Sequence, residues 1–252
     1  LGTWGMQCIG MFRSYQDIDE YFTKYNITSY MGYAKEDVKP GMLIYKDVRG
    51  ERQADGTYAA PDGVVSAEND QVRLSNRNNP YSMTMNLNAE WKGISLTAQF
   101  NASWGGYSFL PDDAISLGNQ GTSANNYNDL EYANMPSFWN TDNMFVYNDV
   151  VDAAGNVVVK ANRNGKYPNL RWSSVNAQKS SYWRISGTRI KLNRLTLAYR
   201  IPSKYTKMLG IESCRFNVTG QNLLSFYNPY PDNFIDPMTI YGNYPTLRKF
   251  TI

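Results

Sequence analysis

The sequence predicts an all-β protein whose strands form an antiparallel sheet of the kind that closes into a large transmembrane β-barrel. Two runs, 83–91 and 94–104, alternate apolar and polar residues without a break, and only Lys92-Gly93 separates them. Because successive side chains of a strand point to opposite faces, the runs form a hairpin with one apolar and one polar face. About 11 residues at roughly 3.3 Å each, tilted by about 45°, rise about 25 Å, the height of an outer-membrane barrel's apolar band.

The two faces of this hairpin differ in chemistry. The polar face carries amides and hydroxyls with Glu90 as its charge, which suits a water-filled lumen as well as a soluble surface. Alternation alone leaves two interpretations open: a barrel wall that faces lipid, and half of the core of a soluble sandwich. The apolar face comprises Met83, Met85, Leu87, Ala89, Trp91, Ile94, Leu96, Ala98, Phe100, Ala102 and Trp104.

Further strands are expected towards the C-terminus. Residues 187–200 alternate, but the apolar phase slips at Asn193-Arg194, which indicates a β-bulge. A fourth strand is expected over 213–223, and a fifth begins near Thr246. A local hairpin is also expected where valines flank the turn residues 152–156.

The rest of the chain is less regular. Ser14 and Asp17 have the spacing of a capping box, and the apolar residues that follow predict a helix over 15–24. Residues 35–80 are dense in Gly, Pro, Asp and Asn and are expected to form an elaborate loop. Residues 105–181 are expected to form a long irregular excursion between the second and third long strands.

The lengths of the connections between strands follow a pattern. In chain order they are long, short, very long, short and long. In an up-and-down barrel, alternate connections lie on the same rim, so all the long loops emerge on one side. Short periplasmic turns and long extracellular loops are typical of outer-membrane barrels. This sorting favours the barrel over the sandwich.

Composition excludes several classes of function. The 252 residues carry a net charge of +3 without a dense basic cluster, so nucleic-acid binding is not indicated. No apolar stretch approaches the length of a transmembrane helix. The chain has no histidine, which removes Ser-His-Asp and Cys-His catalysis and histidine-bound metals. Cys8 and Cys214 lie far apart in the sequence, so a disulfide between them is allowed but nothing in the sequence supports it.

The order of several segments resembles the C-terminal part of SusC-type TonB-dependent transporters, outer-membrane importers of Bacteroidetes. The most specific match is RFNVTGQNLLSF at 215–226, above all its Gln221-Asn222-Leu223. The matching segments, in chain order and spanning nearly the whole chain, are 10–18, 40–47, 80–81 with 91–93, 183–202, 210–211 with 215–226, 236–237 and 244–252.

The resemblance implies that 1–252 is the C-terminal part of such a barrel: 1–80 mainly extracellular loop, 81–104 a transmembrane hairpin, 105–181 an extracellular loop, and 186–252 the last strands with one extracellular loop. It implies import of an oligosaccharide or peptide across the bacterial outer membrane, without catalysis or cofactor. The implied partners are a SusD-type surface lipoprotein, the lipid bilayer, and TonB through segments upstream of this chain. A soluble or surface β-sandwich that binds carbohydrate is the alternative.

Aromatic residues of the expected loops are the candidates for substrate contact, because aromatic rings offer large apolar area at low entropic cost. The alternative is that these rings form small cores inside the loops. Near Asp47 the resembling family often carries a calcium loop, but Arg49 stands at a ligand position here, so no metal is expected. Turn formation explains most of the acidic residues over 47–70, and an oxygen-rich cation site is the alternative. The candidate substrate-binding residues are Tyr107, Phe109, Trp139, Tyr227 and Tyr230.

Overall fold

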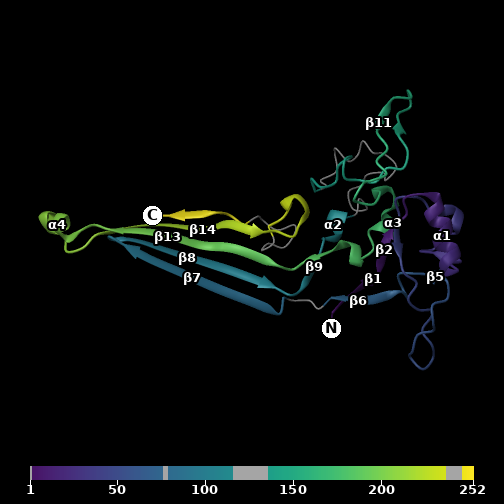
Figure 1. Cartoon of the computed structure of the whole chain (residues 1–252), viewed down its shortest axis with the longest axis horizontal. Coiled ribbons are helices and arrows are strands. Elements are labelled where there is room, and N and C mark those ends of the chain that lie inside the picture. Colours follow the sequence, from purple (N-terminus) through teal and green to yellow (C-terminus); the bar gives the residue numbers. More distant parts are fainter. Residues whose placement is uncertain (1, 76–78, 116–135, 237–245) are drawn as a thin grey trace. The chain divides into compact units, whose positions relative to one another are not determined.

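The computed structural model describes residues 2–75, 79–115, 136–236 and 246–252, and the chain divides into two compact units (Figure 1). Unit 1 comprises Leu1–Asn76 and Phe109–Arg184, and unit 2 comprises Arg77–Ser108 and Ile185–Ile252. Each unit is therefore made of two chain segments, and the segments of the two units alternate along the sequence. Residues 116–135 of the expected excursion and 237–245 of the last loop lie outside the described residues.

Unit 1 is built from short elements. A helix over 15–24 is confirmed as α1 (Tyr15–Tyr25), with the Asp17 main-chain N–H donating to Ser14 Oγ at 3.1 Å and the Ser14 N–H donating to Asp17 Oδ2 at 3.2 Å. The helix ends at Asn26, whose φ of 52° is left-handed. The other elements are β1 (Thr3–Met6), β2 (Cys8–Met11), β3 (Ser29–Tyr30), η1 (Lys35–Asp37), β4 (Leu43–Tyr45), β5 (Val64–Val65), β6 (Gln71–Ser75), α2 (Asp112–Ile115), β10 (Val150–Val151), β11 (Val157–Val159), η3 (Leu170–Trp172), α3 (Ser173–Asn176) and η4 (Ser181–Trp183).

The elaborate loop expected over 35–80 contains the short strands β4, β5 and β6. They pair with strands from the beginning of the chain: β4 with β2 and β6 with β1, both antiparallel, and β5 with β3 in parallel. The expected hairpin around 152–156 is confirmed as β10 paired with β11. The pairings of β4, β5 and β6 join very short segments that are distant in the sequence. For this reason no local alternation of apolar and polar residues predicts them.

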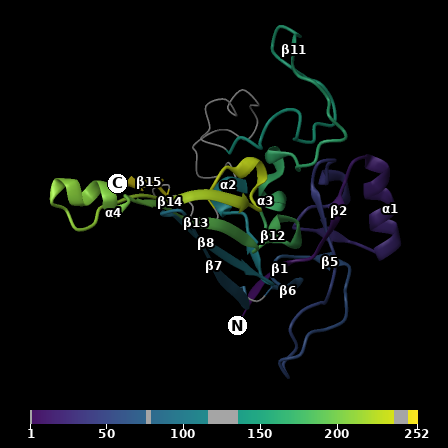
Figure 2. The ribbon, with the colours of Figure 1, turned by 60° about the vertical axis from the view of Figure 1, so that its left-hand side comes forward.

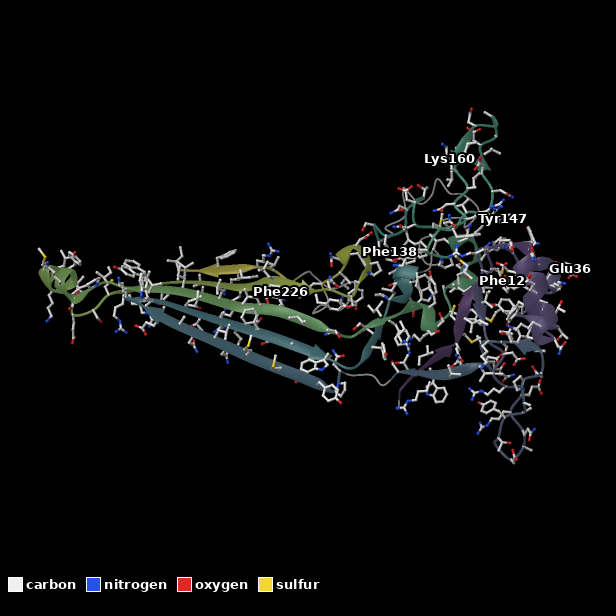
Figure 3. The ribbon with its side chains drawn as sticks, viewed as in Figure 1. Phe12, Glu36, Phe138, Tyr147, Lys160 and Phe226 are labelled. Atoms are coloured by element: carbon white, nitrogen blue, oxygen red, sulfur yellow. The ribbon has the colours of Figure 1, made fainter. Side chains whose placement is uncertain are left out.

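Buried tyrosines tie these short elements of unit 1 together. The Tyr21 hydroxyl donates to the Tyr45 carbonyl at 2.5 Å, and the Tyr30 hydroxyl donates to the Leu43 carbonyl. The Tyr45 hydroxyl donates to the Val175 carbonyl at 2.8 Å, which links the two chain segments of the unit. Phe12 packs edge-on against Tyr21 and Tyr30, whereas Glu36 and Lys160 lie on the outside (Figure 3). Buried polar groups stabilise a fold only when they are paired, and these hydroxyls are paired.

Unit 2 is a five-stranded sheet with the order β15-β14-β13-β8-β7, in which all neighbours are antiparallel (Figures 1 and 2). The expected hairpin is confirmed, with Tyr81 opposite Trp104 and Trp91 opposite Ile94. The third strand carries the expected bulge between Leu192 and Arg194. The strands are β7 (Tyr81–Trp91), β8 (Ile94–Trp104), β13 (Arg189–Arg200), β14 (Arg215–Tyr227) and β15 (Lys249–Thr251).

The connections of the sheet are sorted by length between its two ends. The two-residue turn Lys92-Gly93 has φ of 46° and 84°, as a type I′ hairpin turn requires. The connection from β13 to β14 lies at the same end and contains α4 (Ser203–Thr206) and η5 (Lys207–Leu209). The connections from β8 to β13 and from β14 to β15 leave from the opposite end; the latter contains η6 (Pro231–Asn233).

Two further strands, β9 (Tyr107–Phe109) and β12 (Arg184–Ser186), pair with each other next to the points where the chain passes between the units. In the part of the chain that the structure describes, no helix has the length and apolar character needed to cross a membrane.

Candidate functional site

The sheet of unit 2 has one apolar face that spans its strands. The register aligns Leu87 with Ala98 and Leu195, and Leu96 with Leu197, so apolar residues stand beside apolar residues. The bulge keeps this alignment, because Leu192 still stands opposite Phe100. Most of the large side chains of this face are exposed, including Met83, Met85, Leu87, Leu96, Leu197, Tyr199, Phe216, Val218, Leu224, Phe226 and Phe250.

The opposite face of the sheet is polar and partly cross-linked by hydrogen bonds between strands. Thr196 Oγ1 and Thr219 Oγ1 are 3.0 Å apart, and Asn193 Nδ2 donates to Gln99 Oε1 at 3.1 Å. At the end with the short connections, Arg215 Nη2 donates to Ser95 Oγ at 2.7 Å. These bonds hold long polar side chains in fixed positions, as a surface for recognition requires.

A hollow of about 400 Å³ lies on this face near the end with the long connections. Thr84, Asn101 and Lys191 form one row across β7, β8 and β13, and Arg189 stands two residues from Lys191 on the same strand. Since residues two apart on a strand share a face, both cations point to the polar side. We take this hollow as the candidate functional site. Its lining includes Thr84, Asn101, Ser103, Arg189, Lys191 and Asn222.

The electrostatics of the hollow centre on Lys191. This residue is only 7% exposed, and its Nζ lies 3.8 Å from Asp236 Oδ2. A separation of 3.8 Å is an ion pair without a hydrogen bond. The neighbouring Asn101 Oδ1 is buried and accepts no hydrogen bond from any described residue. The hollow thus combines positive charge with an unused acceptor.

The candidate residues named from the sequence fall in different places. Tyr107 is exposed and Phe109 half-buried on β9, and Tyr227 is exposed at the end of β14. Tyr230 is half-buried with its ring edge-on to Phe234 at 5.5 Å, and burial raises the pKa of its hydroxyl. The structure does not gather them with Trp139 into one described cavity.

Trp139 is a core residue of unit 1. Its side chain is 7% exposed, its Nε1 donates to the Ala114 carbonyl at 2.6 Å, and its ring contacts those of Tyr167 and Trp183. Phe138, labelled in Figure 3, is buried and its ring contacts that of Trp139. Phe145 is also buried within unit 1. For these rings the structure favours the small-core interpretation that the sequence left open.

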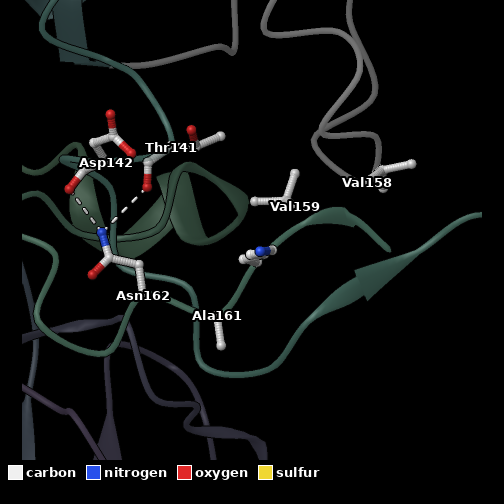
Figure 4. Close-up of a pocket in the computed structure, with 7 residues that line it drawn as sticks. Thr141, Asp142, Val158, Val159, Ala161 and Asn162 are labelled. Atoms are coloured by element: carbon white, nitrogen blue, oxygen red, sulfur yellow. Dashed lines mark hydrogen bonds between the residues drawn. The ribbon is translucent and has the colours of Figure 1, made fainter. Parts of the chain in front are cut away.

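Three other hollows lie within the described residues of unit 1. One of about 350 Å³ has Tyr147 in its lining, whose ring is covered by the Arg163 guanidinium at 4.4 Å and met edge-on by Tyr15. Another, of about 470 Å³, is shown in Figure 4. There Asn162 Nδ2 donates to the carbonyls of Thr141 at 3.2 Å and Asp142 at 2.8 Å, so its amide is used to fix the loop.

The acidic stretch near Asp47 acts mainly in turn formation. Buried Asp70 accepts hydrogen bonds from the main-chain N–H groups of Val48, Arg49 and Ser66. Burial raises the pKa of Asp47, with the nearby Asp70 adding to the shift, although the Gly63 N–H counteracts it. Within the described ranges, no group of three or more His, Cys, Asp and Glu side chains is placed to hold a metal ion.

Sequence reasoning did not single out Arg189 and Lys191. The usable signal was the phase of the strand, because Ile190 and Leu192 share the apolar face and so place Arg189 and Lys191 on the polar face. Their position beside Thr84 and Asn101 depends on the register between strands, which the sequence alone does not specify.

The chain is therefore all-β, with a five-stranded antiparallel sheet that is apolar on one face and polar on the other. Among solved structures it resembles the RagAB peptide transporter, with a TM-score of 0.51 and 16% identity over 94% of this chain and 20% of that chain. It also resembles the RagAB peptide importer in its closed-closed state, with a TM-score of 0.50 and 18% identity over 94% and 20% of the two chains.

The likeness covers about a fifth of the length of the RagAB chains and, at these identities, shows a shared fold. No protein-family model matches the sequence. No curated protein matches it either.

Proposed function

We propose that this chain forms part of the wall and the outer loops of a SusC-type TonB-dependent importer in the bacterial outer membrane. Its polar face lines the path of a nutrient, either a peptide or an oligosaccharide, and its apolar face contacts lipid. The fold shared with RagAB, a peptide importer, favours a peptide. The observation that carries the proposal is the exposed apolar face across long antiparallel strands.

The exposed apolar face needs an apolar surrounding. Soluble monomers rarely expose contiguous apolar patches above a few hundred Å². Phe216 and Phe226 of β14 are each 58% exposed, and Leu197 of the neighbouring strand β13 is 49% exposed. In a carbohydrate-binding sandwich a second sheet covers such a face, and among the described residues no second sheet packs there. In the proposed arrangement, lipid covers this apolar face and keeps it from water without a second layer of protein.

The sorted connections give the orientation of the proposed wall. Lys92-Gly93 and the segment 203–210 form the periplasmic rim, and the segments 105–181 and 225–244 lie outside the cell. Residues 1–80 also belong mainly to the outer side. This orientation follows the rule that outer-membrane barrels have short periplasmic turns and longer extracellular loops.

The proposed partners follow from the resemblance to SusC-type transporters. A SusD-type surface lipoprotein covers the outer loops, and TonB acts through segments upstream of this chain. Loops on a rigid scaffold are where binding residues concentrate, so Tyr107, Tyr227 and Tyr230 remain candidates for contact with cargo or with the lipoprotein. Each is exposed or half-buried.

Cysteine labelling on intact cells tests the orientation. Single cysteines are introduced at Asn233 and at Lys92 in a full-length variant whose Cys8 and Cys214 are serines. An impermeant maleimide is expected to label Asn233→Cys and to spare Lys92→Cys. Lysed cells provide the control, in which both positions react. Labelling of Lys92→Cys in intact cells contradicts the orientation, and recovery of the protein in the soluble fraction contradicts the membrane assignment.

A further inference from the structure

The hollow on the polar face of unit 2 has two positively charged side chains in its lining, both from β13. Arg189 and Lys191 alternate with apolar Ile190 on β13, and Lys191 stands opposite Asn101 of β8. Two cations therefore lie on one face of one strand, at the end of the sheet with the long connections. In the proposed orientation this is the outer part of the nutrient path.

Lys191 is an unusual residue for such a position. Lysine is almost never fully buried unless it is paired, and Lys191 is 7% exposed. Among the described residues its Nζ has one ionic partner, Asp236 Oδ2 at 3.8 Å, and donates no hydrogen bond. An ammonium group has three donors, so the ion pair leaves them available to a ligand.

Asn101 supplies the second half of the recognition pattern. Its Oδ1 is buried and accepts no hydrogen bond from any described residue, and a buried acceptor without a donor destabilises the fold. The residue stands between Thr84 and Lys191 in the row across three strands. A ligand that binds both Lys191 and Asn101 must therefore present an anionic acceptor to Lys191 and a hydrogen-bond donor to Asn101.

We propose that this hollow binds the C-terminal carboxylate of a short peptide, with Lys191 and Arg189 donating to the carboxylate and Asn101 Oδ1 accepting from the peptide N–H beside it. The proposal rests on the import function proposed above and names the chemical class of its cargo. The volume of about 400 Å³ lies within the range of small-ligand sites. Asp236 is the resident counter-ion that the bound carboxylate replaces beside Lys191.

The test uses the full-length transporter in outer-membrane vesicles and two probes. Both are fluorescent N-acetylated pentapeptides of alanine and serine, one with a free C-terminal carboxylate and one with a C-terminal amide. The intact protein is expected to bind the free acid at least about tenfold more tightly than the amide, which corresponds to about 1.4 kcal/mol, since hydrogen bonds to charged groups are stronger than neutral ones. Equal affinity for the two peptides overturns the carboxylate site and leaves peptide import intact.

Two variants test whether the preference for the free-acid peptide arises at this hollow. Lys191→Gln removes the buried charge, and Asn101→Asp places an anion beside Lys191 with almost no change of shape. Both are expected to bind acid and amide equally. The matched control is Arg200→Gln, which removes a charge from the same strand at its other end and is expected to keep the preference. Heat-modifiable migration on a gel verifies that each variant has assembled its barrel.

The outcomes separate this inference from the proposed function. A Lys191→Gln protein that assembles and still prefers the free acid overturns the site. An intact protein that binds neither peptide overturns both this inference and peptide import. Binding of an oligogalacturonate that depends on Lys191, without binding of either peptide, assigns the hollow to uronic acids and also overturns the peptide proposal.

Discussion

In unit 1 the large apolar side chains point inward and pack on one another, whereas in unit 2 they point outward from one face of a single sheet. Trp183, Tyr30 and Phe12 of unit 1 are almost fully buried. Among the described residues of unit 2, the buried apolar side chains are Ala98, Leu192 and Ala198. Both units contain many aromatic residues, so composition alone does not separate them.

This difference shows how each unit is stabilised. Unit 1 removes its own apolar surface from water, at roughly 25 cal/mol per Å². Unit 2 leaves that surface available, so its stability depends on what surrounds it. Core substitutions are therefore expected to act on unit 1 in any solvent, whereas the proposed function predicts that substitutions on the apolar face of unit 2 act through the bilayer.

The largest effect is expected from truncating the aromatic cluster of unit 1. Trp183 is 2% exposed, stacks on Tyr167, and donates its Nε1 hydrogen to the Asn176 carbonyl at 2.7 Å. Trp183→Ala is expected to lower the free energy of unfolding by about 3–5 kcal/mol. Denaturant unfolding followed by tryptophan fluorescence measures this loss. A loss below that of an exposed control, Trp4→Ala, contradicts the assignment of Trp183 to the core.

A charge on the apolar face of unit 2 tests the bilayer directly. Leu96→Arg is expected to cost about 2–4 kcal/mol near the middle of the membrane, and Thr97→Arg on the polar face much less. Refolding of the full-length protein into lipid vesicles measures both. Equal tolerance of arginine at the two neighbouring positions argues against the membrane assignment of the sheet.

The turn between β7 and β8 is expected to give a smaller effect. Gly93 has φ of 84°, and a Cβ added there lies 3.0 Å from the Arg200 carbonyl oxygen. Gly93→Ala is therefore expected to cost about 1–2 kcal/mol. Lys92→Asn is the matched control and is expected to be neutral or slightly stabilising, because Asn-Gly is a preferred two-residue turn. The same vesicle refolding assay compares them.

The smallest effect is expected at Asp47 of unit 1. Burial raises the pKa of this carboxyl above its ordinary value of 3.8, so the folded state holds the proton more tightly than the unfolded state. Stability linked to this group is therefore highest at acidic pH and falls as pH rises through the folded pKa. Asp47→Asn is expected to stabilise the protein relative to wild type at pH 7 and to give no advantage at pH 3.5.

Denaturant titrations of both proteins in EDTA at the two pH values provide the comparison. Because the difference between variant and wild type is compared at each pH, carboxyl groups that do not interact with Asp47 cancel. A variant that is less stable than wild type at pH 7 contradicts the expected direction.

The sheet and the helix were predictable because their signals are local. The alternation of 83–104, the phase slip at Asn193-Arg194 and the capping box at Ser14 each specify their element without help from distant residues. The end of β14 was misjudged: the strand continues to Tyr227, past Asn222 with its φ of 54°. That left-handed residue interrupts the alternation from which the boundary was estimated.

The core of unit 1 was not predictable because its pairings join distant segments. Trp139 looked like an exposed loop aromatic, and only the folded chain places it beside Tyr167 and Trp183. The hollow beside Lys191 was not predictable for the related reason that its lining comes from strands that are distant in the sequence. Alternation gives the two faces of β13, but the register with its neighbours decides which residues stand beside Lys191.

The hydrogen bond from the Leu110 N–H to the Trp183 carbonyl, at 3.0 Å, has a consequence for how the chain folds. β8 and β13 are neighbours although residues 105–188 separate them, and closing a flexible loop of that length costs about 4 kcal/mol of length-dependent entropy. Once unit 1 has folded, Leu110 and Trp183 are already side by side. The long excursion then behaves kinetically like a short turn, so unit 1 is expected to form before β8 and β13 pair.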